Sequence, residues 1–368
     1  MRDRLQIFVG LLMIVPAPGA SGDQVHSAHA QQPQIDRWMY ANNFSGGARP
    51  SASTFSALPQ ATGDDDRMAQ VVVKFDTVAA GVPAGLGAEN YQPTRVVFTA
   101  VIADSLDLYY DPTEDAHTTY GTGYAADADI GRPFEVHGTG FRNGFTAATF
   151  LENSTFGGGS PYHRNAYALG YSPAGVARDV TNNVTLGFDA HPWAVGKVSH
   201  IPDGETTPVP LAPGASVPVY ATVTFELNLA LPGVAEYVRQ SFNQGFIWLT
   251  LSSLHSSEMY GSTGYPGYYN KENNEHLLFG DLAPRFDAEY TLPLRVAAFS
   301  RNASTNACRV EWNASPGFQY VVQRSTSLAP GQWTNLTPVP LTTAAPARLI
   351  FDGAGSGDRS FFRILRTK

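Results

Sequence analysis

Residues 219–229, VYATVTFELNL, decide the fold class of this 368-residue chain. Apolar side chains occupy every second position, at Val219, Ala221, Val223, Phe225, Leu227 and Leu229. Alternation with a period of two is typical of a β-strand that has one face in a core and the other in water. The segment therefore predicts a half-buried strand.

Other segments carry the same kind of signal. Runs rich in β-branched and aromatic residues appear as QVVVKFD at residues 70–76 and RVVFTAVIA at residues 95–103, with glycine and proline between them. FIWLTLSSL at residues 246–254 is mostly apolar, which predicts a fully buried strand. A returning strand of this kind commonly closes a jelly roll, so we expect an all-β protein built on a jelly-roll-like β-sandwich.

The best helix candidate is residues 234–243. Val234, Tyr237, Val238 and Phe242 fall on one face of a helix with 3.6 residues per turn. Gly245 follows, and glycine is the usual residue just beyond a helix C-terminus.

Composition limits the class of protein. Charged residues make up 15% of the chain, against about 25% in average proteins. The chain also holds 35 glycines and 26 prolines. These values favour short strands and turns over long amphipathic helices. The formal net charge of −8 argues against a nucleic-acid backbone as a partner, because binding one requires a basic patch.

The N-terminus has the features of an export signal. Arg2 and Arg4 precede an apolar run, IFVGLLMIV at residues 7–15, that is too short to span a bilayer. Ala28-His29-Ala30 fits the small-x-small rule for cleavage, which predicts a signal peptide over residues 1–30, although a site near residues 19–22 lies closer to the apolar run. We therefore expect a secreted or cell-surface protein with no transmembrane segment after cleavage.

The lone cysteine sets a further limit. Cys308 is the one cysteine of the chain, so no intrachain disulfide can form. The fold must then be held by its core or by ions.

Residues 36–103 resemble a known family. The carrying segments are DRWMY at residues 36–40, SGGARPSASTFSAL at 45–58, RMAQVVVKFDT at 67–77 and PTRVVFTAVIA at 93–103. In this order they resemble the opening of the DNRLRE-type jelly-roll domains of secreted bacterial proteins. The resemblance implies a carbohydrate-binding β-sandwich and no catalysis. This chain departs from that pattern after Asp104, and no sugar-contacting residue can be carried over.

A domain boundary is expected near residue 292, which gives a large domain over residues 31–292 and a small one over 293–368. Short strands and turns fill the second domain, with Trp312, Trp333 and a final Phe-Phe-Arg run. These features resemble the fibronectin-III-like or immunoglobulin-like modules at the C-termini of many secreted bacterial proteins. The resemblance implies a spacer or attachment unit.

Residues 107–145 combine acids, tyrosines and glycines, which predicts a long ordered loop system. Its densest acidic group consists of Asp107, Asp111, Glu114, Asp115, Asp127 and Asp129. Calcium prefers six to eight oxygen ligands, and such a loop can supply them, although the spacing of an EF-hand is missing. We therefore expect a calcium site here. The alternative is that these acids cap turns and stay hydrated.

Aromatic side chains among turn residues point to ligand binding. Flat aromatic faces pack against the C–H faces of sugar rings, while nearby polar groups bind hydroxyls. The tyrosines in such segments are Tyr162, Tyr167, Tyr260, Tyr265, Tyr268 and Tyr269. Arg132, His137 and Arg142 are candidate polar partners. The alternatives are that the tyrosines cover the core at the sandwich edge, and that His137 binds backbone groups beside a turn.

The sequence thus predicts an exported, non-catalytic protein that binds polysaccharide through aromatic loops and is stabilised by calcium. A polysaccharide lyase or glycoside hydrolase is an alternative, because such enzymes use pairs of carboxylates. A purely structural surface or matrix protein is another. The chain has no Gly-x-Ser-x-Gly elbow, P-loop or HExxH motif, which argues against serine hydrolases, nucleotide enzymes and zincins.

Overall fold

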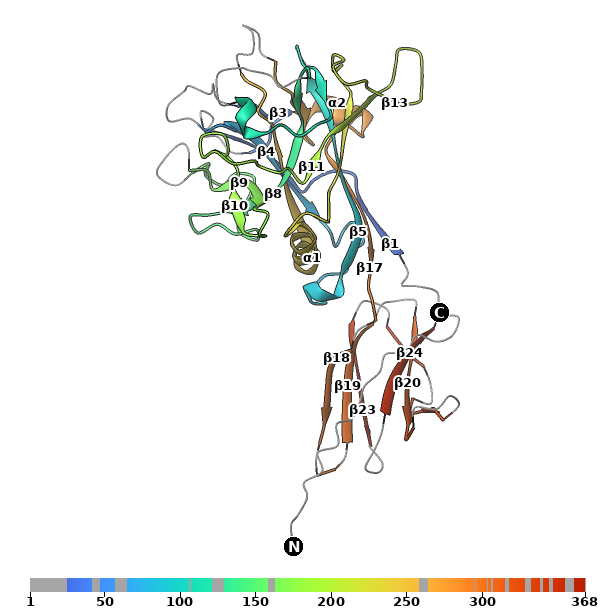
Figure 1. Ribbon diagram of the computed structural model, residues 1–368. Coiled ribbons are helices and arrows are strands. Elements are labelled where there is room, and N and C mark those ends of the chain that lie inside the picture. The colour runs from blue at the N-terminus through green and yellow to red at the C-terminus, as the bar shows by residue number, and fades with distance from the viewer. Residues whose placement is uncertain are drawn as a thin grey trace. The chain divides into compact units, whose positions relative to one another are not determined.

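The computed structural model describes residues 25–41, 47–56, 65–105, 107–120, 129–157, 163–257, 264–294, 296–302, 304–305, 307–314, 318–327, 332–337, 340–343, 347–354 and 361–367. The chain divides into two compact units (Figure 1). The larger unit comprises Ser27–Ala84 and Pro93–Tyr290, and the smaller unit includes Gly85–Gln92 and Thr291–Lys368. Both are built from antiparallel sheets, so the all-β expectation is confirmed.

Two sheets form the larger unit. The first runs in the order β1 (Val25–Ala30), β17 (Arg285–Thr291), β5 (Gln92–Asp104), β14 (Thr222–Glu226), β12 (Lys197–His200), β13 (Val209–Pro210), and β5 also pairs with β16 (Gly267–Tyr269), which pairs with β3 (Ser51–Ser53). The second runs in the order β10 (Ala177–Asp179), β9 (Ala166–Tyr171), β8 (Glu135–Phe141), β15 (Phe246–Ser252), β4 (Ala69–Asp76), β2 (Ile35–Tyr40), and β11 (Ala194–Val195) pairs with β8.

Aromatic side chains join the two sheets into a sandwich. Phe75 of β4 lies 6.1 Å from Phe98 of β5 and 5.6 Å from Phe286 of β17, measured between ring centroids. All three rings are fully buried. Burying side chains of this size contributes about 1.5–3 kcal/mol each, so this contact is a main source of the sandwich's stability.

The buried strand expected at residues 246–254 is confirmed as β15. It pairs with β4 on one side and β8 on the other, and every side chain from Ile247 to Ser252 is buried. The alternating segment is confirmed over a shorter range, because β14 covers Thr222–Glu226. Val219 is 41% exposed and Tyr220 has a positive φ of 66°, so the chain turns before the strand begins.

The expected helix is confirmed as α1 (Val234–Gln244). Val234, Val238 and Phe242 are buried, and Gly245 adopts the left-handed conformation that ends the helix. The Tyr237 hydroxyl donates to the Trp248 carbonyl at 2.7 Å, which fixes α1 against β15. A second helix, α2 (Asn274–Phe279), was not expected.

The expectation that residues 107–145 form only a loop system is wrong. β6 (Tyr110–Asp111), a 3-10 turn at His117–Tyr120, β7 (Arg132–Pro133) and the central strand β8 lie within it. A Cβ on Gly138 would lie 2.1 Å from the Trp193 ring, and one on Gly140 would lie 2.3 Å from the Tyr167 ring. Gly138 and Gly140 therefore leave room for neighbouring rings beside a buried strand instead of marking turns.

The strand β1 lies within the segment expected to be a signal peptide. It is hydrogen-bonded to β17, and the His29 backbone N–H donates to the Ala80 carbonyl at 3.0 Å. His29 Nδ1 also lies 2.7 Å from Asp287 Oδ1. Cleavage after Ala30 would remove this strand from the sheet, whereas cleavage near residues 19–22 would leave it in place.

The smaller unit holds two further sheets. One runs β18 (Val296–Arg301), β19 (Ala307–Ala314), β23 (Ala347–Ala354), and the other pairs β20 (Gln319–Ser325) with β21 (Thr334–Asn335), β22 (Leu341–Thr342) and β24 (Phe361–Thr367). Trp312 and Tyr320 come from different sheets and lie 6.1 Å apart in one buried cluster. This unit therefore has a core of its own.

Candidate functional site

Three of the six predicted metal ligands come together in the larger unit. Asp111, Asp115 and Asp129 each offer one carboxylate oxygen, and these oxygens lie within 4.8 Å of one another. We call these three residues the aspartate cluster. The parallel pairing of β6 with β7 holds the two ends of this segment together. The cluster is therefore a local feature of a chain segment closed by a short β-bridge.

Each carboxylate of the aspartate cluster has a hydrogen-bond partner on the chain. The Thr113 hydroxyl lies 2.7 Å from Asp111 Oδ1 and 3.1 Å from Asp129 Oδ2. Asp115 Oδ2 accepts from the Tyr120 hydroxyl at 2.6 Å and from Arg132 at 3.1 Å. Burial raises the pKa of Tyr120 well above its ordinary value, so its hydroxyl keeps the proton that it donates. Asp111 Oδ2 is buried and has no hydrogen-bond partner.

The other predicted metal ligands lie elsewhere. Asp107 is exposed and has a positive φ of 51°. Glu114 pairs with His191, whose Nδ1 lies 2.9 Å from Glu114 Oε1. Asp127 falls outside the described residues. The structure thus reduces the predicted set of six to a compact set of three.

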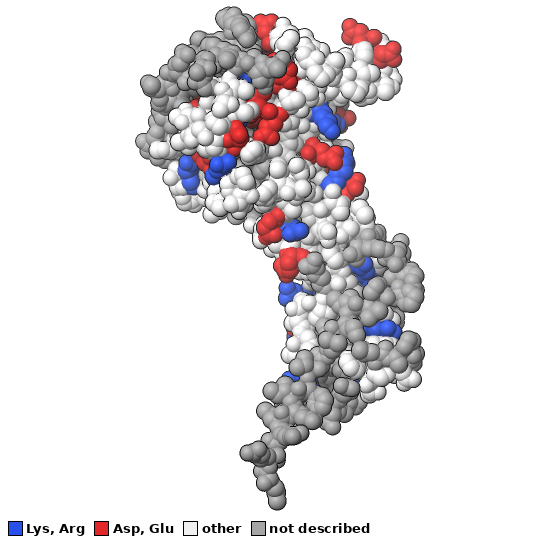
Figure 2. Space-filling view, in the orientation of Figure 1, with Lys and Arg blue, Asp and Glu red and all other residues white. Residues whose placement is uncertain are grey.

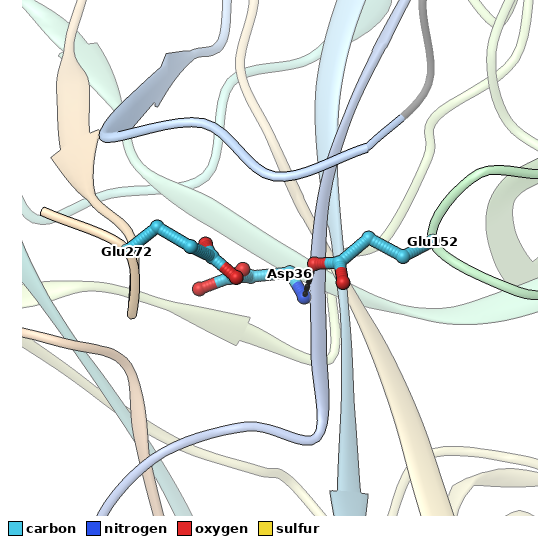
Figure 3. Close-up of side chains that lie close together, drawn as sticks. All are labelled: Asp36, Glu152 and Glu272. Carbon is cyan, nitrogen blue, oxygen red and sulfur yellow. Dashed lines mark hydrogen bonds between the residues drawn. The ribbon is translucent and has the colours of Figure 1, made fainter.

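A second carboxylate trio was not found from the sequence. Asp36, Glu152 and Glu272 also bring their oxygens within 4.8 Å of one another. Figure 3 shows the three carboxylates converging from separate parts of the chain. The Lys271 ammonium is bonded to all three, at 2.8 Å from Asp36 and 2.5 Å from each glutamate. We call these four residues the lysine cluster.

Burial and charge act together in the lysine cluster. Burial raises the pKa of Asp36 to about 7, against the opposing hydrogen bonds from Lys271. Burial lowers the pKa of Lys271, but its hydrogen bonds to the three carboxylates outweigh this and raise it. The raised pKa of Asp36 and the raised pKa of Lys271 are compatible, because a proton on the Asp36 carboxylate leaves the ammonium paired with the two glutamates.

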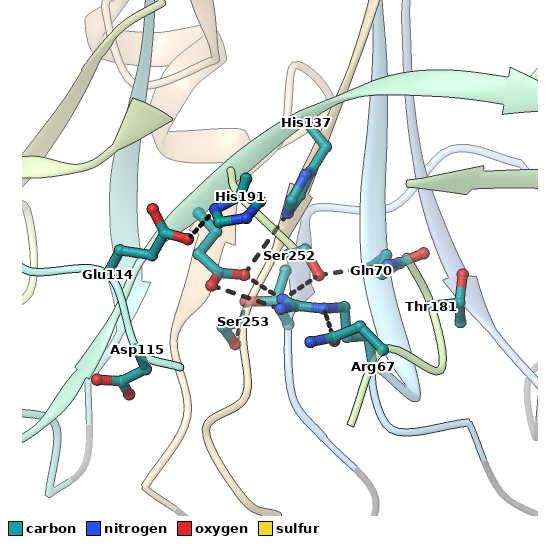
Figure 4. A network of polar contacts seen from close by, with 12 residues as sticks. Arg67, Gln70, Glu114, Asp115, His137, Thr181, His191, Ser252 and Ser253 are labelled. Atoms are coloured by element: carbon teal, nitrogen blue, oxygen red, sulfur yellow. Dashed lines mark hydrogen bonds and ion pairs between the residues drawn. The ribbon is translucent and has the colours of Figure 1, made fainter. Parts of the chain in front are cut away.

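His137 belongs to a buried polar network around strands β8 and β15 (Figure 4). Arg67 forms an ion pair with Glu135 and donates to Asn183 at 3.0 Å and to Ser252 at 3.2 Å. His137 Nε2 lies 3.6 Å from Glu135 Oε2. Burial raises the pKa of Glu135, but the charge of Arg67 and the neighbouring His137 outweigh this and lower it. The network thus places the Arg67–Glu135 ion pair in the buried interior.

The histidines beside this pair are neutral. Burial lowers the pKa of His137, and it lowers that of His255 to about 3. His137 is completely buried, so it does not face a ligand in this structure. His137 lies inside strand β8 beside the Glu135 side chain, and not beside a turn as the alternative expected.

The predicted tyrosines have different environments. Tyr268 and Tyr269 lie in β16 and are 0% and 5% exposed. Tyr265 is half-buried against Phe55, with ring centroids 4.8 Å apart. Tyr167 is half-buried on β9. Tyr162 and Tyr260 lie outside the described residues. Two of the four described rings therefore belong to the core.

The two predicted arginines are both paired with acids. Arg132 bonds Asp115, and its guanidinium lies 4.3 Å from the centre of the Tyr120 ring. Arg142 pairs with Asp179 and lies 4.2 Å from the centre of the Tyr167 ring. The geometry gives both side chains a structural role.

An aromatic pocket lies at the edge of the larger unit's second sheet. Its cavity has a volume of about 230 Å³ and is lined by Tyr171, Ser172, Pro173, His191, Trp193, Leu231, Pro232 and Val234. The Tyr171 and Trp193 rings are stacked, with centroids 5.9 Å apart and an interplanar angle of 14°. Trp193 also meets Tyr237 of α1 edge-on at 4.8 Å. We call this feature the Tyr171 pocket.

Two histidine–carboxylate pairs lie beside the Tyr171 pocket. His191 lines the cavity and pairs with Glu114, and His117 Nδ1 lies 2.7 Å from Asp189 Oδ1. Burial raises the pKa of Glu114, although the neighbouring His191 opposes this shift. The hydrogen bonds that the His117 backbone and ring give to Asp189 lower the pKa of that carboxyl group. The pocket thus combines stacked rings with acidic groups.

Acidic side chains also gather on the larger unit's surface. Figure 2 shows several groups of Asp and Glu there, with arginines and lysines placed next to acids. This distribution agrees with the formal net charge of −8. In the described part of the chain, none of the helices has the length and apolar character needed to span a bilayer.

No protein-family model, curated protein or solved structure matches this chain. The Tyr171 pocket was not found from the sequence. Its lining residues come from segments 171–173, 191–193 and 231–234, which only the fold brings together. A functional argument must therefore start from the geometry of the pocket and of the two carboxylate trios.

Proposed function

We propose that this chain is an exported, non-catalytic protein that binds a polysaccharide, and that one sugar ring enters the Tyr171 pocket. The observation that carries the proposal is the stacked pair Tyr171 and Trp193 in a cavity that His191 also lines. Aromatic faces pack against the C–H faces of sugar rings, and polar groups at the rim of a pocket form hydrogen bonds with the sugar hydroxyls.

The size of the pocket supports a single ring. Its volume of about 230 Å³ lies below the range of about 300–1,000 Å³ that is usual for drug-sized ligands. A cavity of this size suits one ring of a longer polymer, with the rest of the polymer outside it.

The polar groups at the pocket suit hydroxyl recognition. When His191 donates its Nδ1 proton to Glu114, its Nε2 becomes an acceptor for a ligand hydroxyl. Ser172 also lines the cavity, and its hydroxyl can donate to or accept from a sugar hydroxyl. These polar groups complement the apolar wall of the pocket.

Calorimetric titration with a panel of soluble neutral and acidic polysaccharides tests the proposal. We expect binding by one or more members of the panel, and a loss of about tenfold in affinity for Tyr171→Ala, which corresponds to about 1.4 kcal/mol. Tyr171→Phe should keep most of the affinity because the ring remains. Tyr167→Ala is the matched control, since Tyr167 lies on the same strand but does not line the cavity.

The same samples separate the alternatives. Release of new reducing ends or unsaturated products from the bound polymer would replace the binding proposal with catalysis. Equal losses in Tyr167→Ala and Tyr171→Ala would move the site away from the pocket. Absence of binding across the panel would leave a structural role as the better account. N-terminal sequencing of the protein recovered from the medium tests the export part.

A further inference from the structure

We infer that the aspartate cluster is a binding site for a hard divalent cation, with calcium as its ligand, and that Asp111, Asp115 and Asp129 supply the carboxylates. The inference does not depend on the Tyr171 pocket, because the two sites share no residue.

The unpartnered oxygen of Asp111 carries the inference. Asp111 is 1% exposed, its Oδ1 is bonded by Thr113, and its Oδ2 is buried without a hydrogen-bond partner. A buried carboxylate oxygen without a partner costs at least about 1–3 kcal/mol. Such a group is expected to have a ligand that the protein itself does not provide.

The spacing of the cluster fits a shared cation. Calcium binds oxygens at about 2.3–2.6 Å, so two of its ligands lie at most about 5 Å apart. The three carboxylate oxygens lie within 4.8 Å of one another, inside this limit. One ion can therefore contact all three, and water or backbone carbonyls can complete the usual six to eight ligands.

The charges of the cluster also favour a divalent ion. Three aspartates lie beside one guanidinium, that of Arg132, which bonds Asp115 Oδ2. The Tyr120 hydroxyl donates to the same oxygen of Asp115 as Arg132 does. Oxygen ligands with several negative charges select hard cations over soft ones.

The ion would join two parts of one segment. Asp111 and Asp115 precede residues 121–128, and Asp129 follows them. A cation bound to all three would tie these parts together beside the β6–β7 pairing. In a chain that cannot form an intrachain disulfide, such a link would stabilise the segment that leads into β8.

The test uses the full chain after EDTA treatment. Calcium chloride at about a hundredfold excess over its Kd should raise the melting temperature by roughly 5–10 °C. Sodium chloride at the same ionic strength should not. Terbium, which substitutes for calcium, should show luminescence excited through tyrosine, because Tyr120 is bonded to a ligand carboxylate.

Asp111→Asn should lose the calcium shift and weaken terbium binding at least tenfold. Asp107→Asn is the matched control: Asp107 is exposed, lies outside the cluster, and has a backbone conformation that asparagine tolerates. If Asp111→Asn does not fold, the exposed Asp129 gives a second variant, Asp129→Asn, with the same expected loss. A calcium shift that survives both cluster variants, a shift with magnesium alone, or no shift in the wild type would overturn the inference.

Discussion

The larger unit contains two carboxylate trios of the same size that differ in their cation. In the lysine cluster, the Lys271 ammonium is bonded to Asp36, Glu152 and Glu272. In the aspartate cluster, Arg132 bonds one carboxylate from the side, and Asp111 Oδ2 has no hydrogen-bond partner. The Lys271 ammonium is thus shared by all three carboxylates of the lysine cluster, whereas the ion pair seen in the aspartate cluster joins Arg132 to Asp115.

This difference shows why close acidic residues alone do not define a metal site. Both trios meet the same spacing, within 4.8 Å. In the lysine cluster the ammonium already takes the central position, so an ion would have to displace it. The unpartnered oxygen in the aspartate cluster is what separates a candidate ion site from a closed salt-bridge network.

Removal of Lys271 should produce the largest effect. In Lys271→Met, three carboxylates lose their common cation, and breaking a buried charge pair in this way costs about 3–5 kcal/mol. We expect a fall of this size in the free energy of unfolding, measured by urea denaturation in EDTA. Added calcium should restore part of it, because the variant then resembles the aspartate cluster.

The control for this variant is Lys197→Met, since Lys197 is exposed on β12 and pairs with none of these acids. It should change the free energy of unfolding by less than about 0.5 kcal/mol. A loss below about 1 kcal/mol in Lys271→Met would show that the lysine cluster is as weak as a surface salt bridge.

The two trios also differ in how far the sequence could reveal them. Asp111, Asp115 and Asp129 fall within nineteen residues, so their local density indicated a site. Asp36, Glu152 and Lys271 are far apart in sequence and are brought together only by the fold of the chain. Sequence spacing carries no information on such contacts, and the same reason hid the Tyr171 pocket.

The fold shows a related limit. Period-two alternation and apolar runs predicted β4, β5, β14 and β15, because these strands bury side chains of ordinary size. β8 was taken for a loop, since its glycines and polar residues imitate turn composition. In the structure those glycines admit Trp193 and Tyr167, while Glu135 pairs with an arginine from elsewhere in the chain. Contacts with residues distant in sequence therefore make β8 a buried strand.

Removal of Arg132 should have a smaller effect that depends on calcium. In Arg132→Met, Asp115 keeps its hydrogen bond from Tyr120, so we expect a loss of about 2–3 kcal/mol in EDTA. Saturating calcium should reduce this loss, because the ion neutralises the same carboxylates. Urea denaturation with and without calcium measures both values.

The matched variant for comparison is Arg142→Met, because Arg142 pairs with Asp179 and stacks on Tyr167 but does not contact the aspartate cluster. Its loss of stability should be the same with and without calcium. An equal loss for Arg132→Met in both conditions would mean that calcium does not act on the trio that Arg132 borders.

Protonation of the lysine cluster should give an effect no larger than that of Arg132→Met. The pKa of Asp36 is near 3.8 in the unfolded chain and about 7 in the folded protein. It rises on folding because burial disfavours the charged form of this carboxyl group, which lies beside Glu152, Glu272 and Lys271. The folded state thus binds a proton that the unfolded state releases. The contribution of Asp36 to stability is complete below about pH 3.8 and is lost as the pH rises through about 7. One proton changes the free energy of unfolding by at most about 1.4 kcal/mol per pH unit.

Comparison with Asp36→Asn isolates this contribution, since the amide does not titrate. From pH 7.5 to pH 5, the wild type should gain stability relative to Asp36→Asn. Asp203→Asn, which replaces an exposed acid, should follow the wild type. If the difference between the wild type and Asp36→Asn stays constant over this range, Lys271 holds all three carboxylates ionised. The lysine cluster would then be a fully charged network, and its contrast with the aspartate cluster would rest on geometry alone.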